Sequence, residues 1–134
     1  MLTTYGKVNP SFIMDMAERT HLTSSTTFLD LGSGIGQTML QVAATLNCEC
    51  VGIELGANLH ESAELLLKKF DALLEAIGCE GRISHKISLI KGNMCDYGGM
   101  IEDADVVFFN NFGSRFIGDT ENILSNHVSV YICL

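Results

Sequence analysis

The chain has 134 residues, 47% of them hydrophobic and only one of them proline, which favours a single compact domain with a modest core and excludes a disordered or low-complexity segment. Its 16 acidic and 8 basic residues give a net charge of −8, which disfavours nucleic acid binding by this chain alone because phosphate neutralisation needs clustered Lys and Arg. No apolar run approaches the roughly 18 residues of a membrane span, and the opening MLTTYGKVNP has neither the basic nor the apolar region of a signal peptide.

The first half of the chain alternates helical and strand patterns. Asn9–Pro10 predicts a helix that continues to about Thr20, with Asn at the N-cap and Pro at the first helical position. Residues 27–31 (TFLDL) predict a short buried strand, a glycine-rich turn follows, and residues 37–46 predict a second helix. Residues 50–54 (CVGIE) then predict a second strand that ends in an acid.

A long amphipathic helix is predicted next, from about Asn58 to Ile77, with Gly78 as its C-terminal cap. Its apolar stripe, which we expect to face the core, consists of Leu59, Ala63, Leu66, Leu67, Phe70, Leu73, Leu74 and Ile77.

The second half of the chain predicts further strands. They cover residues 86–90 (KISLI), residues 104–109 (ADVVFF) and the tail HVSVYICL, and the segment KGNMCDYGG reads as a loop. Strands that alternate with helices indicate βαβ units, so we expect an α/β fold, a mostly parallel sheet with helices on both faces and a ligand at the carboxyl ends of the strands. We find no internal repeat and no linker, and expect one domain over residues 1–134.

The segment TTFLDLGSGIGQ is the first candidate for a ligand site. Its glycines lie at positions 32, 34 and 36 and Gln37 follows, so the spacing is G-x-G-x-G instead of the G-x-G-x-x-G of dinucleotide sites. Asp30 comes just before the turn, and a carboxylate there suits a ligand with a cationic ammonium group better than a pyrophosphate. S-adenosyl-L-methionine carries an ammonium and a sulfonium group; the alternative is a glycine-rich connector without a ligand.

Two further segments follow strand ends in the same way. Glu54, 22 residues after Gly32, can accept hydrogen bonds from both ribose hydroxyls, although a surface carboxylate is the alternative. After the third strand, Gly92–Asn93–Met94 is expected beside the adenine, with Asn93 on the base edge and Met94 on its face. A plain loop is the alternative for these residues.

Two consecutive amides, Asn110 and Asn111, directly follow the fourth strand and precede Phe112. At the carboxyl end of a central strand they would lie beside the expected methyl group. An amide oxygen there can hold a target amine in line with the sulfonium, because methyl transfer from a cation to a neutral amine needs positioning and desolvation more than acid–base chemistry. An ordinary Asn turn is the alternative.

The five cysteines are an odd number and include no CxxC pair. Cys48 and Cys50 could suggest a metal, but no His or Cys lies at zinc-like spacing from them. We therefore expect no metal site and reduced thiols of an intracellular protein.

Four segments in this order, Tyr5–Gly6, VNPSF, DLGSGIGQ and VVFFNNF, resemble the disruptor-of-telomeric-silencing family of histone methyltransferases. The resemblance covers nearly the whole chain, from about Tyr5 to Phe112. It implies a Rossmann-like class I methyltransferase fold, without a SET domain, that transfers methyl from S-adenosylmethionine to a lysine on the core of histone H3 in nucleosomes. It also implies a nuclear location.

By the same resemblance, particular residues take on roles. Tyr5 and Gly6 resemble the loop over the cofactor, and Glu54 resembles the ribose acid. Gly92, Asn93 and Met94 resemble the adenine loop, and Asn110, Asn111 and Phe112 the lip of the lysine channel. The segment that cradles the methionine part is matched by Phe28, Leu29, Asp30, Leu31, Gly32, Ser33, Gly34, Ile35, Gly36 and Gln37.

The chain departs from the family pattern at several positions. Lys7 stands where the family usually has Glu, Asn93–Met94 where it has Asp–Phe, and Gly113–Ser114 where it has Ala and an aromatic residue. The family domain also continues well beyond the Asn–Asn–Phe motif and carries a basic segment that this chain lacks. We therefore expect a partial domain, incomplete at its C-terminus, that contains the cofactor-binding half. The alternatives are a non-catalytic cofactor-binding remnant or interaction domain, another class I methyltransferase, and, more distantly, a nicotinamide dehydrogenase.

Overall fold

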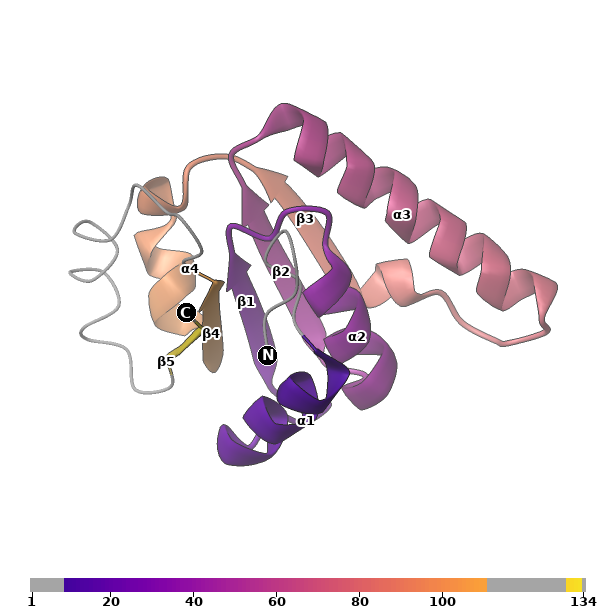
Figure 1. Cartoon of the computed structure of the whole chain (residues 1–134), viewed down its shortest axis with the longest axis horizontal. Helices are drawn as coiled ribbons and strands as arrows, with labels where there is room; N and C mark the ends of the chain where they lie inside the picture. Colours follow the sequence, from indigo (N-terminus) through magenta and orange to yellow (C-terminus); the bar gives the residue numbers. More distant parts are fainter. Residues whose placement is uncertain (1–8, 111–129, 134) are drawn as a thin grey trace.

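The sheet is the centre of the molecule. In the computed structural model, which describes residues 9–110 and 130–133, five strands lie in the order β3-β2-β1-β4-β5 (Figure 1). Every neighbouring pair is parallel. The strands are β1 (Thr27–Leu31), β2 (Glu49–Glu54), β3 (Ile87–Lys91), β4 (Val106–Asn110) and β5 (Val130–Cys133). The strand order reverses between β1 and β4, so the carboxyl ends of these strands form the crevice where open α/β sheets bind ligands.

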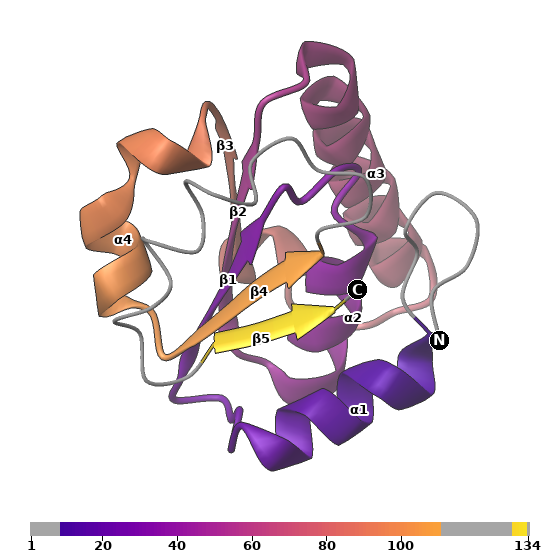
Figure 2. The same ribbon diagram turned by 60° about the vertical axis from the view of Figure 1, so that its left-hand side comes forward.

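Helices cover both faces of the sheet, as predicted. α1 (Pro10–Arg19), α2 (Gln37–Leu46) and α3 (Ala57–Ala76) lie on one side, and α4 (Gly98–Asp103) lies on the other (Figure 2). Two short 3₁₀ turns, η2 (Ile83–Lys86) and η3 (Met94–Asp96), flank β3. The parallel sheet with helices on both faces confirms the predicted fold class.

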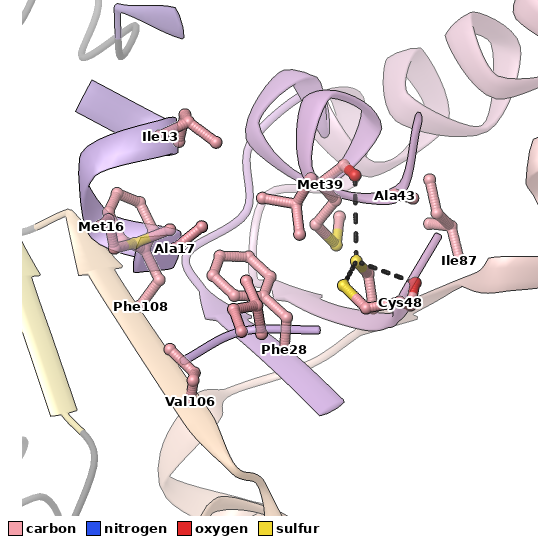
Figure 3. Close-up of a cluster of buried hydrophobic side chains, with 13 residues drawn as sticks. Ile13, Met16, Ala17, Phe28, Met39, Ala43, Cys48, Ile87, Val106 and Phe108 are labelled. Carbon is pink, nitrogen blue, oxygen red and sulfur yellow. Dashed lines mark hydrogen bonds between the residues drawn. The ribbon is translucent and has the colours of Figure 1, made fainter. Parts of the chain in front are cut away.

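Successive side chains of β1 and β4 point to opposite faces of the sheet, so the core is divided into two clusters. On the α2 side, Phe28 and Phe108 stack with ring centroids 6.0 Å apart, beneath Met39 and Met16 from the helices (Figure 3). On the α4 side, the buried cluster consists of Leu29, Leu31, Ile53, Ile101, Val107 and Phe109. Because successive side chains of a strand point to opposite faces, Asp30 lies on the α2 side, two residues along the strand from Phe28.

Two predicted helix ends are confirmed in detail. Asn9 Oδ1 accepts a hydrogen bond from the Ser11 backbone N–H at 2.8 Å, with Pro10 at the first helical position. At the end of α3, Gly78 has a φ of 77°, and the backbone N–H groups of Gly78 and Cys79 donate to the carbonyls of Glu75 and Leu74. This pair of bonds is the Schellman arrangement that glycine permits.

The apolar stripe predicted for α3 is partly wrong. Ala63 is the buried residue of that helix, whereas Leu59, Leu73 and Ile77 are 46%, 57% and 65% exposed. The rest of the stripe is half-buried. The reason is that α3 packs on β2 and β3 at the border of the sheet, where only one flank of the helix meets other elements.

Smaller differences concern element boundaries. Lys86 belongs to η2 instead of β3, and the segment read as a loop contains η3 and the first residues of α4. The Asn93 side chain accepts a hydrogen bond from the Cys95 N–H and so caps η3. This bond favours a helical turn in a segment whose glycines predict a loop. Within the described ranges, no helix is long and apolar enough to cross a membrane.

Candidate functional site

The glycine turn after β1 has the backbone conformation that its glycines permit. Gly32, Gly34 and Gly36 have φ values of 72°, 56° and 82°, a region that side chains other than glycine rarely adopt. The N–H groups of Gly32 and Ser33 both donate to the carbonyl of Ile53, at 2.8 and 3.1 Å. The turn is therefore fastened to the end of β2 and leads directly into the N-terminus of α2.

Glu54 connects three turns at the carboxyl edge of the sheet. Its Oε1 accepts from the Gly34 N–H and its Oε2 from the Gly56 N–H, both at 2.8 Å. Its backbone carbonyl accepts from the Gly92 N–H at 2.9 Å. Because each carboxylate oxygen has two lone pairs, the side chain retains acceptor capacity for hydroxyl groups of a ligand while it holds the glycine turn in place.

Asp30 is the buried acid of the site, 3% exposed. In the sheet register it lies between Gly52 of β2 and Phe108 of β4. Burial, followed by the nearby Glu54 carboxylate, raises the pKa of Asp30 to about 8. An ionised carboxylate in this place is costly without a positive group beside it, so the site favours a cationic ligand.

The free energy of unfolding should therefore fall as the pH rises from about 3.8 to about 8, the pKa values of Asp30 in the unfolded and folded chain. The unfolded carboxyl releases its proton near 3.8 and the folded one near 8, so between these values the folded state holds the extra proton and ionisation opposes folding. We expect Asp30→Asn to remove this loss and to exceed the parent's unfolding free energy at pH 8 by on the order of a few kcal/mol.

Denaturant unfolding between pH 4 and pH 8 measures this effect. The exposed Asp103→Asn is the matched control and should retain the parent's pH dependence. A parent whose stability changes with pH just as that of Asp30→Asn does would contradict the assignment.

Gly92, Asn93 and Met94 lie at the same edge. The Met94 side chain reaches the glycine turn, where its methyl carbon lies 3.9 Å from the position a Cβ on Gly32 would occupy. The Asn93 oxygen accepts from the Cys95 N–H at 3.0 Å. Tyr97 packs over Gly92, because a Cβ there would lie 3.0 Å from the tyrosine ring. Met94 is thus brought next to the glycine turn, and Gly92 is bonded to Glu54 at the end of β2.

The remaining predicted site residues fall into three groups: buried strand residues, residues in or next to the site edge, and residues that the structure does not describe. Phe28, Leu29 and Leu31 are buried in the two core clusters, so only their backbone can face a ligand. Asn110 ends β4 beside β1. Tyr5, Gly6, Asn111 and Phe112 lie outside the described residues, so their roles stay predictions. Ser33, Ile35 and Gln37 are half-buried in and after the turn.

Gly52 is a residue of the site that the sequence reasoning missed. A Cβ at this position would overlap the side chain of Met39 and would lie 2.8 Å from the Ser33 Cβ. The turn and α2 therefore rest directly on the backbone of β2. A glycine inside a strand is a known sign of such close backbone approach, and it could have identified this position.

Other candidate sites of the described residues do not coincide with this edge. A groove of about 480 Å³ lies near the amino end of β1, lined by Met14, Asp15, Ala17, Glu18, Leu22 and Leu46. Cys48 and Cys50 are buried free thiols with their sulfurs 3.8 Å apart, and a hydrogen bond from Cys50 lowers the pKa of Cys48. Within residues 9–110 and 130–133, no three His, Cys, Asp or Glu side chains lie together as metal ligands.

A known protein family matches most of this chain. The family model described as "Histone methylation protein DOT1" matches residues 2–127. Histone-lysine N-methyltransferases named as specific for H3 lysine-79 from Aspergillus fumigatus and Emericella nidulans are each 35% identical over 126 residues, 92% of this chain. The chain spans 24% of the length of each of these relatives.

Solved structures give the same architecture. An RNA methyltransferase from Salinibacter ruber, in complex with S-adenosyl-L-homocysteine, superposes with a TM-score of 0.68 at 21% identity, over 93% of this chain and 71% of its own. A Geobacter metallireducens precorrin-6y C5,15-methyltransferase superposes with a TM-score of 0.71 at 11% identity, over 98% and 65%. At these identities the similarity establishes the Rossmann-like methyltransferase fold.

Proposed function

The chain belongs to the DOT1 family of histone methylation proteins, and we propose on that premise that it forms the S-adenosylmethionine-binding part of a histone-lysine N-methyltransferase. One observation carries the proposal: Asp30, just before the glycine turn in β1, and Glu54, at the end of the adjacent β2, lie on either side of a turn that Glu54 itself holds in place. A buried acid that favours a cation, next to an acid that can accept hydroxyl protons, matches a ligand with an ammonium group and a ribose.

We assign each part of the cofactor to a group of this chain. Glu54 would accept the ribose hydroxyls, and Asp30 would face the ammonium group. The backbone of Gly32, Gly34 and Gly36 would lie against the methionine part, because the absence of a side chain at these three positions permits close approach. Met94 would pack on the adenine, and the Asn93 amide nitrogen would face the base edge. When bound, S-adenosylmethionine supplies the methyl group on its sulfonium.

The acceptor is proposed to be a lysine of histone H3 within the nucleosome, in the nucleus. The family and the names of the relatives support this substrate, and the acceptor side of the site is assigned to Asn110, Asn111 and Phe112. The amide oxygens would orient the neutral lysine amine toward the methyl group. Since this chain corresponds to about a quarter of its relatives, the activity is proposed for a protein that also supplies the remaining regions.

Cofactor binding should release a proton from Asp30. At pH 6.5 the folded carboxyl is mostly protonated because its pKa is about 8, whereas a bound ammonium group favours the ionised form. We expect up to one proton to be released per cofactor, measured by calorimetric titration in two buffers with different ionisation enthalpies. Asp30→Asn should bind without this release. Equal heats for the parent in both buffers would remove Asp30 from the ammonium site.

A methyl-transfer assay on recombinant nucleosomes tests the proposed activity. We expect little or no transfer by residues 1–134 alone. A chimera that continues into the corresponding downstream region of the Aspergillus fumigatus relative should methylate histone H3, and should lose this activity with Glu54→Ala. A chimera that binds the cofactor but leaves nucleosomes unmodified would contradict the histone assignment while leaving cofactor binding intact.

A further inference from the structure

The segment that connects β3 to α4, residues 92–97, carries the two side chains proposed for the adenine, Asn93 and Met94 (Figure 2). We call this segment the base loop. Two backbone hydrogen bonds close the base loop on itself. The N–H of Asp96 donates to the Asn93 carbonyl at 3.0 Å, and the N–H of Tyr97 donates to the Met94 carbonyl at 3.1 Å. The loop is therefore a compact unit that ends at Tyr97.

The Tyr97 side chain folds back on the first residue of the base loop. A Cβ on Gly92 would lie 3.0 Å from both the hydroxyl oxygen and the Cε2 atom of Tyr97. The tyrosine therefore occupies the place that a side chain at position 92 would take. The Gly92 N–H donates to the Glu54 carbonyl at 2.9 Å, so the tyrosine ring packs on the residue that joins the base loop to the end of β2.

The position of the Tyr97 ring is itself well fixed. The Tyr97 backbone N–H closes η3, and its carbonyl accepts from the Ile101 N–H at 3.1 Å in the first turn of α4. The half-buried ring packs against the buried cluster on the α4 side of the sheet, which contains Ile101 and Val107. A side chain that is held by two helical turns and a core cluster provides a rigid support for a loop.

The order of the base loop bears on affinity because this loop carries the side chains assigned to the base. The Met94 methyl carbon lies 3.9 Å from the position a Cβ on Gly32 would occupy, so this side chain extends from the loop to the glycine turn. The Asn93 oxygen accepts from the Cys95 N–H, which directs the amide nitrogen toward other partners. Side chains that have to be ordered only on binding lower the affinity for a ligand.

We infer that Tyr97 is a positioning residue for the base end of the cofactor site. Its ring fills the space beside Gly92 and holds the base loop, and with it Asn93 and Met94, in the geometry that binds the base. This role rests on the proposed cofactor site. Tyr97 acts through the loop and not by touching the ligand, so its removal weakens binding of the adenosine part and leaves the ammonium end unaffected.

Calorimetric titration of the 134-residue chain with two ligands tests this role. S-adenosylhomocysteine carries the adenine, the ribose and the ammonium group, whereas 5′-methylthioadenosine lacks the amino-acid part. Tyr97→Ala should raise the Kd of both ligands by the same factor, about tenfold, because two side chains of the base loop then have to be ordered on binding. Tyr97→Phe keeps the ring beside Gly92 and should bind both ligands as the parent does.

Ile101→Val is the matched control, because it removes a methyl group from the same buried cluster but none from the base loop. It should lower the free energy of unfolding and leave both Kd values at those of the parent. Circular dichroism and thermal unfolding identify the variants that are folded under the titration conditions. If Tyr97→Ala does not fold, Tyr97→Leu takes its place with the same expectation, since leucine keeps apolar volume in the cluster but lacks the ring.

The outcomes separate the role of Tyr97 from the cofactor site itself. A Tyr97→Ala variant that binds both ligands as tightly as Ile101→Val does would overturn the role of Tyr97 and leave the cofactor site in place. A loss confined to S-adenosylhomocysteine would overturn it as well, because the effect would then lie at the amino-acid end. A folded parent chain that binds neither ligand would remove the cofactor site, and the role of Tyr97 with it.

Discussion

Replacing Glu54 by alanine is expected to weaken S-adenosylmethionine binding by about 1.5–3 kcal/mol, roughly a 10- to 150-fold rise in Kd. The loss has two causes. The proposed hydrogen bonds to the ribose disappear, and so do the two bonds from the Gly34 and Gly56 N–H groups that hold the turns in place. Calorimetric titration of the folded variant measures the change in affinity directly.

Glu49→Ala is the control for this experiment. Glu49 lies on the same strand, but its side chain is 57% exposed and contacts Lys86 at 3.5 Å on the surface. Removing an exposed pair of this kind costs little, so affinity for the cofactor should stay at the parent's value. A Glu54→Ala variant that binds as tightly as Glu49→Ala would show that Glu54 is no part of the ligand site.

Gly52→Ala is expected to lower the unfolding free energy by about 1–3 kcal/mol and to weaken cofactor binding as well. A single added methyl group would overlap Met39, which is fully buried, and would press against Ser33 of the glycine turn. Since the turn rests on this part of β2, relief of the overlap has to displace the turn or α2. Thermal unfolding and cofactor titration report the two effects separately.

Gly99→Ala provides the comparison, because a Cβ there meets no atom within 4 Å and the residue lies in helix α4. An added methyl group at a helical glycine is expected to be neutral or slightly stabilising. If Gly52→Ala melts at the temperature of Gly99→Ala and binds as tightly, the close approach of the turn to β2 does not restrict the site as we describe.

Sequence alone could predict much of the sheet. β1 and α2 have the predicted bounds, Thr27–Leu31 and Gln37–Leu46. The glycine turn between them marks where the strand ends and the helix begins, and the hydrophobic residues of each segment follow a clear pattern. The tail strand was predicted as well, and β5 occupies Val130–Cys133. Where such a local signal is strong, the parallel architecture follows from the alternation of elements.

The sequence could not show which flank of α3 would be covered. Leu59, Leu67 and Leu73 all suit the apolar stripe of an amphipathic helix, yet Leu67 packs against the core whereas the other two are exposed. Which side chains of α3 are buried depends on how much of the helix is covered by β2, β3 and η2 at the border of the sheet. The periodicity of the sequence does not contain that information.

For the site, residue types could be predicted but not their mutual contacts. The sequence indicated Asp30, Glu54 and the glycines as ligand-binding residues. That Glu54 also ties together the turns at Gly34, Gly56 and Gly92 depends on the register of three strands, which only the folded sheet fixes. The burial that raises the pKa of Asp30 is likewise a property of the packed core.

The central claim, that the carboxyl edge of β1 and β2 binds S-adenosylmethionine, is tested most directly by nuclear magnetic resonance titration of the isotope-labelled chain. We expect saturable shifts of the backbone amides of Gly32, Gly34, Gly36 and Gly92, with far smaller changes at Gly78 and Gly81, which lie beyond the end of α3. A folded chain whose glycine-turn amides do not respond to a saturating excess of the cofactor would contradict the account.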